Sequence, residues 1–430
     1  MVRQVVAVPY AWAMPAAIEI PTTLAHAKGA YTATVSFGSL ANHANLVLDT
    51  GSSSLAVLTR VYDPGQDDDV NATALVQEIN YGGGAWAGPV VHSTLGFGHG
   101  HHARRLLQAP FGVIESDAPV LRQADGIWGL AYRDLNPAYD VTALLASQGC
   151  QSGLSWPWPF PQGHALDLPS LRTNLQAQPR SWLEPAFSAL EEEGIVRDRF
   201  AMSIGRAVVH ASEGTLHATD TASAQLNQGT LVLGGGRELQ HHYNGGFHQV
   251  RVLHDHYYNV NLRAIRVGSE RPIPVPALPA SELETRYSNA LLDTGSSFLV
   301  LDATVYQQVL AALARCDAEF PALVERAQKA LAKDNGVPNH LIDVRRWPDL
   351  HLTLEAPDGT DTELLVRASH YWPKNALKAG QSLCLLMSQL PHFRGQNILG
   401  LPLMAERYVV FERDTGTQGC IGFADRRPAA

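Results

Sequence analysis

Short segments in which apolar and polar side chains alternate, or in which a brief apolar run lies between turn residues, recur along the chain. Some of them are rich in β-branched and aromatic residues and predict β-strands. These are residues 31–37, 44–49, 75–81, 230–235 and 407–413. Glycine and proline number 36 and 26, which suits short strands separated by turns. The pattern predicts a mainly β protein.

Helical periodicity is confined to fewer segments. Residues 184–194 have a proline near the start and a glycine at the end, the asymmetry typical of a helix. Residues 303–336 predict a longer helical stretch that Pro321 breaks. Residues 155–169 combine prolines with aromatic residues and predict a surface loop.

The N-terminal segment 5–17 is apolar, but it contains two prolines and is shorter than the roughly 18–20 residues that a membrane helix needs. Its position after Arg3 is compatible with a weak signal peptide. Residues 2–8, however, alternate and are branched at Cβ, as strands are. We favour the strand and expect no association with membranes.

The most informative feature is an internal repeat. Residues 47–57 read VLDTGSSSLAV and residues 291–301 read LLDTGSSFLVL, so that Asp, Thr, Gly and two Ser coincide. Each copy is followed by an element of apolar residues and glycine, GIWGLAY at 126–132 and NILGLPL at 397–403. Two matched pairs predict two structurally related halves that each contribute one aspartate to a shared cleft.

The length and the charge of the chain limit the number of domains and the kinds of partner that we expect. The 430 residues exceed one ordinary hydrophobic core, so we expect an N-terminal lobe over 1–205 and a C-terminal lobe over 206–430. The formal net charge of −9 argues against a nucleic-acid partner, because such proteins carry basic patches. The 18 histidines become charged in mild acid, which is compatible with an acid-active enzyme.

Each residue type in the DTGS motif suits acid–base catalysis. When the carboxylates of Asp49 and Asp293 are brought together they share one proton, so that one can act as a base and the other as an acid. A water held between them can attack a carbonyl directly, and no cofactor or metal is expected. Glycine would supply a backbone N–H, serine a hydrogen bond to the outer carboxylate oxygen, and threonine a link between the loops. These supporting residues are Thr50, Gly51, Ser52, Thr294, Gly295 and Ser296.

Other clusters carry weaker signals. The four cysteines are scattered, so free buried thiols and a reducing compartment are expected rather than a metal site. They are Cys150, Cys316, Cys384 and Cys420. The histidines of HGHHARR at 99–105 and the pair His241 and His242 are interpreted as solvent-exposed, since the sequence identifies no further convergent ligand. The GGG runs lack the strand–loop–helix context of a phosphate loop.

With these motifs the chain resembles the pepsin-like aspartic peptidases over nearly its whole length. Residues 79–88, INYGGGAWAG, resemble the flap hairpin of that family, and residues 125–132 resemble the element that crosses the first catalytic loop. Residues 398–424 resemble the stretch that crosses the second loop, while 185–205 and 231–235 resemble the region between the lobes. The resemblance implies two related β-barrel-like lobes with an extended peptide in a central cleft.

The resemblance also implies roles for individual residues. Tyr81 and Gly82 of the flap would close over the substrate, and Val47 and Ile127 would line an apolar pocket beside the cut bond. The expected activity is that of an aspartic endopeptidase with an acid optimum and a preference for hydrophobic residues flanking the cut. Peptides or unfolded proteins would be its substrates and pepstatin-type compounds its inhibitors, and we expect a monomer.

The chain departs from the family pattern in several places. Ala56 stands where the family usually has a tryptophan that holds the flap tyrosine, and Trp86 is a candidate to replace that tryptophan. Residues 150–180 and 207–228 resemble insertions, and the small disulfide loop of the family is lacking. Few residues precede Asp49, which leaves little room for an inhibitory prosegment.

This combination is similar to that of bacterial pepsin homologues such as the shewasins, which implies a soluble enzyme without a zymogen. Together with the cysteines, it leads us to expect a cytoplasmic enzyme, with a periplasmic or secreted one as the alternative. The competing hypothesis on function is an inactive pepsin-fold protein that acts as a binding or inhibitory module. Such relatives usually lose an aspartate, a glycine or the flap tyrosine, and all of these are present here.

Overall fold

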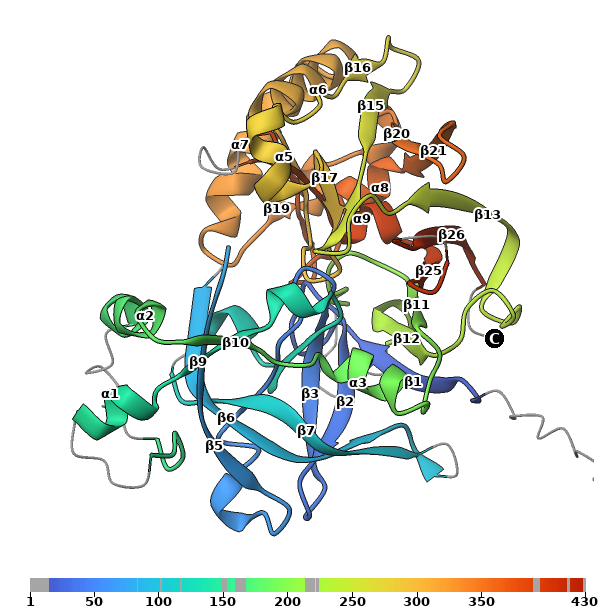
Figure 1. Cartoon of the computed structure of the whole chain (residues 1–430). Coiled ribbons are helices and arrows are strands. Elements are labelled where there is room, and N and C mark those ends of the chain that lie inside the picture. Colours follow the sequence, from blue (N-terminus) through green and yellow to red (C-terminus); the bar gives the residue numbers. More distant parts are fainter. Residues whose placement is uncertain are drawn as a thin grey trace, which may run out of the picture.

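The structure is a computed structural model whose description covers residues 15–82, 84–100, 103–116, 118–147, 153–158, 168–212, 221, 224–389, 395–415 and 418–427. Strands dominate these residues. Figure 1 shows two bodies, one built mainly by the first half of the chain and the other by the second half. The mainly β, bilobal fold expected from the sequence is confirmed. Residues 2–8, expected as a strand, lie outside the described residues.

The five predicted strands are all present, with shifted ends. They are β2 (Thr32–Phe37), β3 (Asn42–Asp49), β5 (Asn71–Tyr81), β12 (Gln228–Leu233) and β25 (Arg407–Glu412). The side chains of β3 are buried from Leu46 onward, as the apolar run before the first DTGS motif predicts.

Within the described residues, fifteen strands join one large sheet. Their order is β10 (Arg180–Trp182), β9 (Pro137–Asp140), β5, β6 (Gly84–Phe97), β7 (Arg104–Ile114), β4 (Leu55–Leu58), β8 (Gly126–Gly129), β3, β2, β1 (Ile18–Thr23), β12, β11 (Arg199–Ile204), β25, β26 (Cys420–Arg426) and β13 (Tyr243–Arg251). Strand β1 pairs with both β2 and β12, and so connects the first body to the layer that both halves share. Because strands from both halves meet in this layer, the boundary at 205/206 stays a prediction.

The second body contains smaller sheets. In the described part of the chain one has the order β14 (Tyr258–Val260), β17 (Ala290–Leu292), β24 (Asn397–Leu399), β18 (Leu299–Leu301) and β23 (Leu386–Ser388). Another has the order β16 (Ile273–Pro274), β15 (Leu262–Val267), β20 (Leu350–Glu355) and β21 (Asp361–Val366), and β19 (Val337–Pro338) pairs with β22 (Gln381–Ser382).

The repeat in the sequence is matched by a repeat in strand pairing. In the first body β3 runs parallel to β8, β8 antiparallel to β4, and β4 parallel to β7. In the second body β17 runs parallel to β24, β24 antiparallel to β18, and β18 parallel to β23. Each DTGS motif therefore leaves the first strand of one four-strand unit and enters the third.

The described helices are α1 (Thr142–Ser147), α2 (Leu168–Gln176), α3 (Ala186–Glu192), α5 (Ala280–Arg286), α6 (Ala303–Cys316), α7 (Phe320–Leu331), α8 (Ala368–Tyr371) and α9 (Leu401–Met404). Helix α3 confirms the prediction for 184–194. The prediction that Pro321 breaks 303–336 was wrong in its position: the break lies between α6 and α7, and Pro321 stands in the first turn of α7. Proline is accepted there because its missing N–H would have no helical partner.

The surface loop predicted for residues 155–169 was only partly right. Trp158 is buried with Val76 and Ala87 in a small apolar cluster, and α2 begins at Leu168, within the predicted loop. Burial of the large indole surface explains why Trp158 packs inward.

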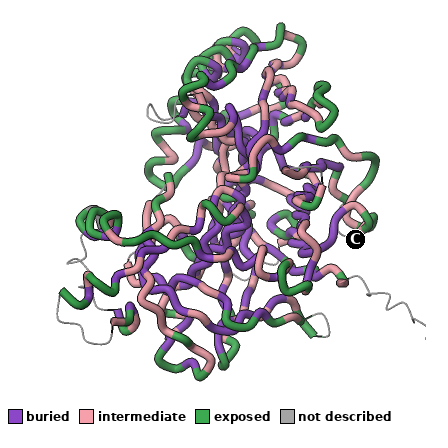
Figure 2. Tube along the Cα trace, in the orientation of Figure 1, coloured by how far each residue is buried: buried purple, intermediate pink, exposed green. Residues whose placement is uncertain are grey.

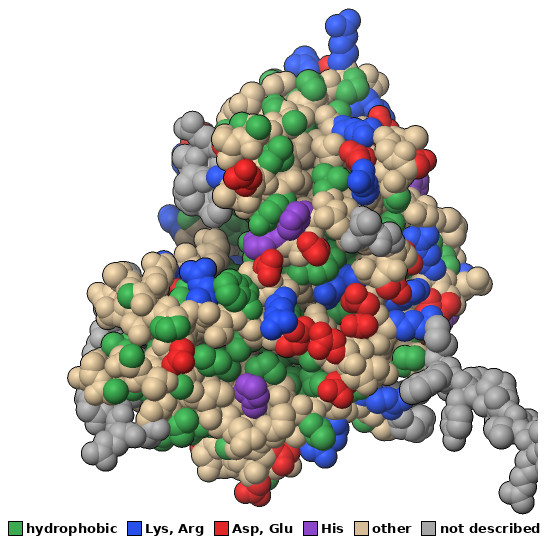
Figure 3. Space-filling view, in the orientation of Figure 1, with side chains coloured by type: hydrophobic (Ala, Val, Ile, Leu, Met, Phe, Trp, Pro, Cys, Tyr) green, Lys and Arg blue, Asp and Glu red, His purple; other side chains and the backbone are tan. Residues whose placement is uncertain are grey.

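Buried residues run through the interior of both bodies, as the purple segments of Figure 2 show. On the face shown in Figure 3, acidic and basic side chains are interspersed rather than gathered by sign. No helix in the described ranges is both long and apolar enough to cross a membrane. Cys316, Cys384 and Cys420 are free thiols, and Cys150 lies outside the described residues.

Candidate active site

Two aspartates meet where the repeated loops approach each other. Asp49 is the last residue of β3, and Asp293 directly follows β17. A Cβ added at Gly51 would lie 2.9 Å from Oδ1 of Asp293 and 3.0 Å from Oδ1 of Asp49. A Cβ added at Gly295 would lie 2.5 Å and 3.1 Å from the same atoms of Asp49 and Asp293. The structure thus brings the two carboxyl groups together, and glycine is needed in both loops because a side chain would displace them.

The two carboxyl groups receive different hydrogen bonds. The Gly51 N–H donates to Oδ1 of Asp49 and the Gly295 N–H to Oδ1 of Asp293, each at 2.8 Å. The Ser52 hydroxyl donates to Oδ2 of Asp49 at 2.5 Å.

The backbone of Ser296 bonds to the carboxyl group of Asp293, but the Ser296 hydroxyl does not follow the expectation that it would do so. Its hydroxyl instead donates to the carbonyl oxygen of Phe298 at 3.3 Å and accepts the Phe298 N–H at 3.2 Å. Serine hydroxyls readily form such local bonds to the backbone two residues away, and here that local turn wins over the carboxylate. The repeat in sequence is therefore not a repeat in hydrogen bonding.

Burial dominates the electrostatics of the pair. It raises the pKa of Asp49, while hydrogen bonds from Ser52 and Gly51 act in the opposite direction. Burial also raises the pKa of Asp293 well above its usual range, and the charge of Asp49 raises that pKa further. Asp49 is therefore the easier of the two to ionise.

Threonines tie the two loops to each other. The Thr50 hydroxyl donates to the carbonyl oxygen of Leu292 at 3.0 Å, and the Thr294 hydroxyl donates to that of Leu48 at 2.9 Å. The same hydroxyls accept the backbone N–H of the opposite threonine, at 3.0 Å for Thr50 N–H and 2.9 Å for Thr294 N–H. All four bonds are buried, so the distance between the two aspartates is fixed by contacts across the two halves.

The apolar-glycine elements cross close behind the loops. A Cβ at Gly129 would lie 2.5 Å from the backbone of Ser53, and one at Gly400 would lie 2.4 Å from the carbonyl oxygen of Ser296. The Leu130 N–H also donates to the carbonyl oxygen of Asp49 at 2.7 Å. Glycine permits this close approach of two backbones, and the crossing chain holds each loop from behind.

Tyr81 lies at the end of the hairpin formed by β5 and β6. Burial raises its pKa and the charge of Asp49 raises it further, while hydrogen bonds with Trp86 and Ser52 act in the opposite direction. Tyr81 is therefore close to the first aspartate. A Cβ added at the neighbouring Gly82 would meet no atom within 4 Å, so there is open space beside Gly82.

Trp86 takes the place of the tryptophan that is missing at position 56. Its indole Nε1 donates to the Tyr81 hydroxyl at 3.3 Å. A Cβ at Gly112 would lie 2.7 Å from the indole ring, and Gly112 is the strand partner of the buried Ala56. The small residues at 56 and 112 thus leave room for an indole that comes from the flap itself.

Val47 and Ile127 lie beneath the flap. They are partners in the parallel pairing of β3 and β8 and are 7% and 5% exposed. Both belong to the apolar cluster against which Tyr81 packs.

Tyr257 was not identified from the sequence. Burial raises its pKa to about 12, and the charges of Asp49 and Asp293 contribute, so its phenol lies near both carboxyl groups. The adjoining strand β14 pairs with β17, which carries Tyr257 to the second loop. No short motif marks this residue, because its position depends on strand pairing.

One comparison with known proteins is informative. Residues 212–425 match the family model described as eukaryotic aspartyl protease. This part of the chain is similar to the aspartyl protease family. A search of curated proteins found no match.

The matched aspartyl protease segment contains Asp293, whereas Asp49 and the flap precede it. The first half of the chain nevertheless has the same strand pairing as the matched second half, and it supplies the other carboxyl group of the pair, that of Asp49. The match to the family model supports peptidase activity in general. The likeness to bacterial pepsin homologues stays a prediction.

Proposed function

We propose that this protein is an aspartic endopeptidase that cuts peptide bonds with a water activated by Asp49 and Asp293. The observation that carries the proposal is the pair of buried carboxyl groups at which both DTGS loops converge, with Gly51 and Gly295 between them. A structural role alone gives no reason to bury two like carboxyl groups in contact, since each raises the free energy of ionising the other.

The unequal hydrogen bonds support different roles for the two aspartates in the resting enzyme. Asp49, which accepts from Ser52 and Gly51, is ionised, and Asp293 holds the shared proton. Asp49 takes a proton from the water as the water oxygen attacks the carbonyl carbon of the peptide. Asp293 donates its proton to the carbonyl oxygen, which gives a neutral tetrahedral diol. Asp49 then returns its proton to the leaving nitrogen as the C–N bond breaks, and Asp293 regains the proton from the diol.

The flap and the apolar cluster support the proposed substrate class. We propose that an extended peptide binds between the carboxyl groups and Tyr81, with hydrophobic side chains against Val47 and Ile127, which belong to the apolar cluster that Tyr81 contacts. A charged side chain there would lose its hydration without gaining a partner. We therefore propose a preference for hydrophobic residues flanking the cut in unfolded substrates, and inhibition by pepstatin-type compounds.

The proposal is tested by measuring hydrolysis of a denatured protein by the full chain from pH 2 to pH 8. The rate should be bell-shaped with an optimum of roughly pH 3–5, because catalysis needs one proton on the pair. Above the optimum both carboxyl groups ionise and the proton donor is lost. Below it both are protonated and the base is lost. Pepstatin should abolish the activity.

Variants separate the dyad from contaminating peptidases. Asp49→Ala and Asp293→Ala should each reduce kcat by at least about 10³-fold, and the double variant should be no worse, because the pair acts as a unit. Asp358→Asn, in an exposed turn, is the control and should keep full activity. Circular dichroism checks that each variant is folded at every pH. Turnover by either alanine variant at the wild-type rate, or inactivity of the folded wild type at every pH, would contradict the proposal.

A further inference from the structure

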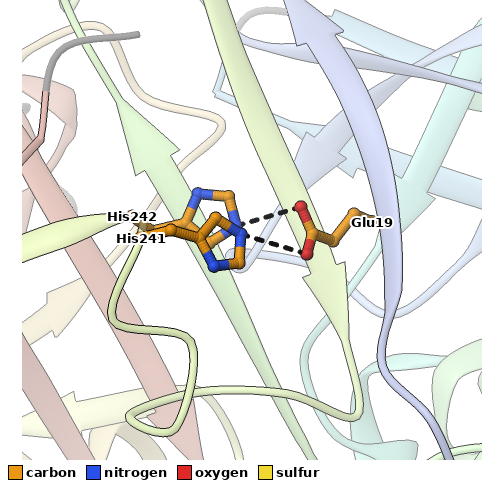
Figure 4. Close-up of side chains that lie close together, drawn as sticks. All are labelled: Glu19, His241 and His242. Atoms are coloured by element: carbon orange, nitrogen blue, oxygen red, sulfur yellow. Dashed lines mark hydrogen bonds and ion pairs between the residues drawn. The ribbon is translucent and has the colours of Figure 1, made fainter. Parts of the chain in front are cut away.

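A carboxylate and two imidazoles converge outside the proposed active site (Figure 4). Glu19 extends from β1, and His241 and His242 lie in the connection between β12 and β13. Both imidazoles point their Nε2 atoms at the same carboxylate. Because Glu19 is far away along the chain, the sequence predicted only that both histidines are exposed; this is right for His241, whereas the side chain of His242 is only 11% exposed.

The spacing of the three groups matches a metal site. Nε2 of His241 is 3.3 Å from Oε1 of Glu19, and Nε2 of His242 is 3.1 Å from Oε2. The possible ligand atoms all lie within 4.8 Å of one another. A tetrahedral Zn²⁺ with bonds of about 2.0–2.1 Å has ligand atoms roughly 3.3 Å apart, so these groups can surround an ion after small side-chain rotations.

Part of the cluster is held in position in advance. The His242 ring stacks on Tyr408 with centroids 5.1 Å apart and an angle of 10° between the planes. The backbone of His242 is bonded on both sides, by its N–H to the carbonyl oxygen of Leu239 at 3.1 Å and by its carbonyl oxygen to the Arg427 N–H at 2.8 Å. Glu19 is held by the pairing of β1 with β12. Preorganised ligands lower the entropy that binding must overcome.

The ligand set also fits zinc chemically. Two neutral imidazoles and one carboxylate are common zinc ligands, and the exposure of His241 leaves room for water as a fourth. The positive charge of Arg426 acts on His242 and opposes a cation, while the Glu19 carboxylate offsets it. We propose that Glu19, His241 and His242 bind one Zn²⁺. The ion would join β1 to the β12–β13 connection and so stabilise the layer that both halves share.

The test is titration of the full, untagged chain with Zn²⁺ alone at neutral pH, by calorimetry after removal of metals. One ion per chain with a micromolar dissociation constant is expected from this site, and saturating zinc should raise Tm by about 2 °C. Glu19→Gln and His241→Gln should each weaken binding at least tenfold. Both side chains are substantially exposed, so these variants should fold. X-ray absorption should show imidazole ligands and no sulfur.

A matched variant tests whether the histidines at 99–102 bind the zinc instead. Replacing His99, His101 and His102 with glutamine should leave the affinity of the Glu19 site unchanged. The proposal is wrong if the wild type binds no zinc or if binding is unchanged in Glu19→Gln and His241→Gln. It is also wrong if zinc is lost only when the residues at 99–102 are replaced.

Discussion

Two serines at equivalent positions of the repeated motif have different surroundings. Ser52 donates to Asp49, whereas Ser296 bonds to the backbone of Phe298. A hydrogen bond to a charged acceptor is stronger than one to a neutral carbonyl. The Ser52 hydroxyl therefore stabilises the ionised form of Asp49, whereas Ser296 assists Asp293 only through its backbone and not through its hydroxyl.

The asymmetry predicts unequal effects of the same substitution. In Ser52→Ala the pKa of Asp49 should rise, because a donor to its ionised form is lost. Asp49 must be ionised to act as the base, so the acid limb of the pH profile should move to higher pH and the rate there should fall several-fold. Ser296→Ala is the matched control and should leave that limb in place. pH profiles of kcat for both variants provide the measurement, and equal shifts would contradict the assignment of roles.

At this scale the sequence predicts what depends on residue type within the motif. Carboxylates, small residues and hydroxyls at 49–52 and 293–296 suffice to infer the pair, since the motif occurs twice. The direction of the Ser296 hydroxyl and the position of Tyr257 could not be predicted. Both depend on which backbone atoms the tertiary fold places nearby.

The flap hairpin is stabilised by a hydrogen bond between its own two strands. Trp86 lies on β6 and bonds to Tyr81 on β5, so the donor and acceptor belong to the same hairpin. Burial of the indole on Gly112 anchors that hairpin to β7. The absence of tryptophan at position 56 indicated from the sequence that Trp86 replaces it. The packing of Trp86 on Gly112 could be seen only in the folded structure.

Trp86→Phe should keep most of the buried ring and remove only the N–H donor. The hydroxyl of Tyr81 would then be less well positioned, and kcat/KM should fall about 3- to 10-fold with little change in Tm. Tyr81→Phe should produce a similar loss, and combining the two should add little. Trp182→Phe is the control, because Trp182 is exposed on β10. Full additivity of the two flap variants would show that the bond does not position Tyr81.

The segment that resembles an insertion supports the outer side of the same hairpin. Arg172 of α2 bonds to Oε1 of Glu78 on β5 through Nε at 3.0 Å and Nη2 at 2.6 Å. Trp158 packs in the same apolar cluster as Val76 and Ala87 of the hairpin. The insertion is therefore in direct contact with the flap strands rather than a separate appendage.

Arg172→Ala should loosen the flap. It leaves the buried carboxylate of Glu78 without its partner, which costs about 1–3 kcal/mol. We expect faster hydrogen exchange in residues 75–88 and a several-fold higher KM, with kcat nearly unchanged. Gln176→Ala, at the exposed end of α2, is the control. Unchanged exchange in the hairpin would mean that α2 does not restrain it.

For the whole molecule, the buried threonine bonds are the main link between the two loops. Thr50→Val removes a donor to Leu292 and an acceptor for the Thr294 N–H. Leaving both groups unpaired should lower the free energy of unfolding by about 2–4 kcal/mol. Peptidase activity should fall as well, because the aspartates would no longer be held at one distance. Urea unfolding and kinetics provide the test, with the exposed Thr304→Val as control; a variant as stable and as active as the wild type would contradict it.

The bilobal fold could be predicted from the sequence because each half carries the same motifs in the same order. The sequence could not predict that β1, β12 and β25 share one sheet, since long-range pairing depends on the complete chain. The contact between Glu19 and the two histidines could not be predicted either, because it joins segments more than two hundred residues apart.

The threonine link also has a consequence for the order in which the protein is made. The ribosome releases the first DTGS loop long before the second, and until then the Thr50 hydroxyl has neither Leu292 nor Thr294 to bond to. A nascent chain that ends before the second loop thus holds only one of the two carboxylates of the proposed site, Asp49, in a loop without its partner. We expect no peptide to be cut until synthesis has passed the second loop and the halves have folded together, so that the chain has no peptidase activity while it is still on the ribosome.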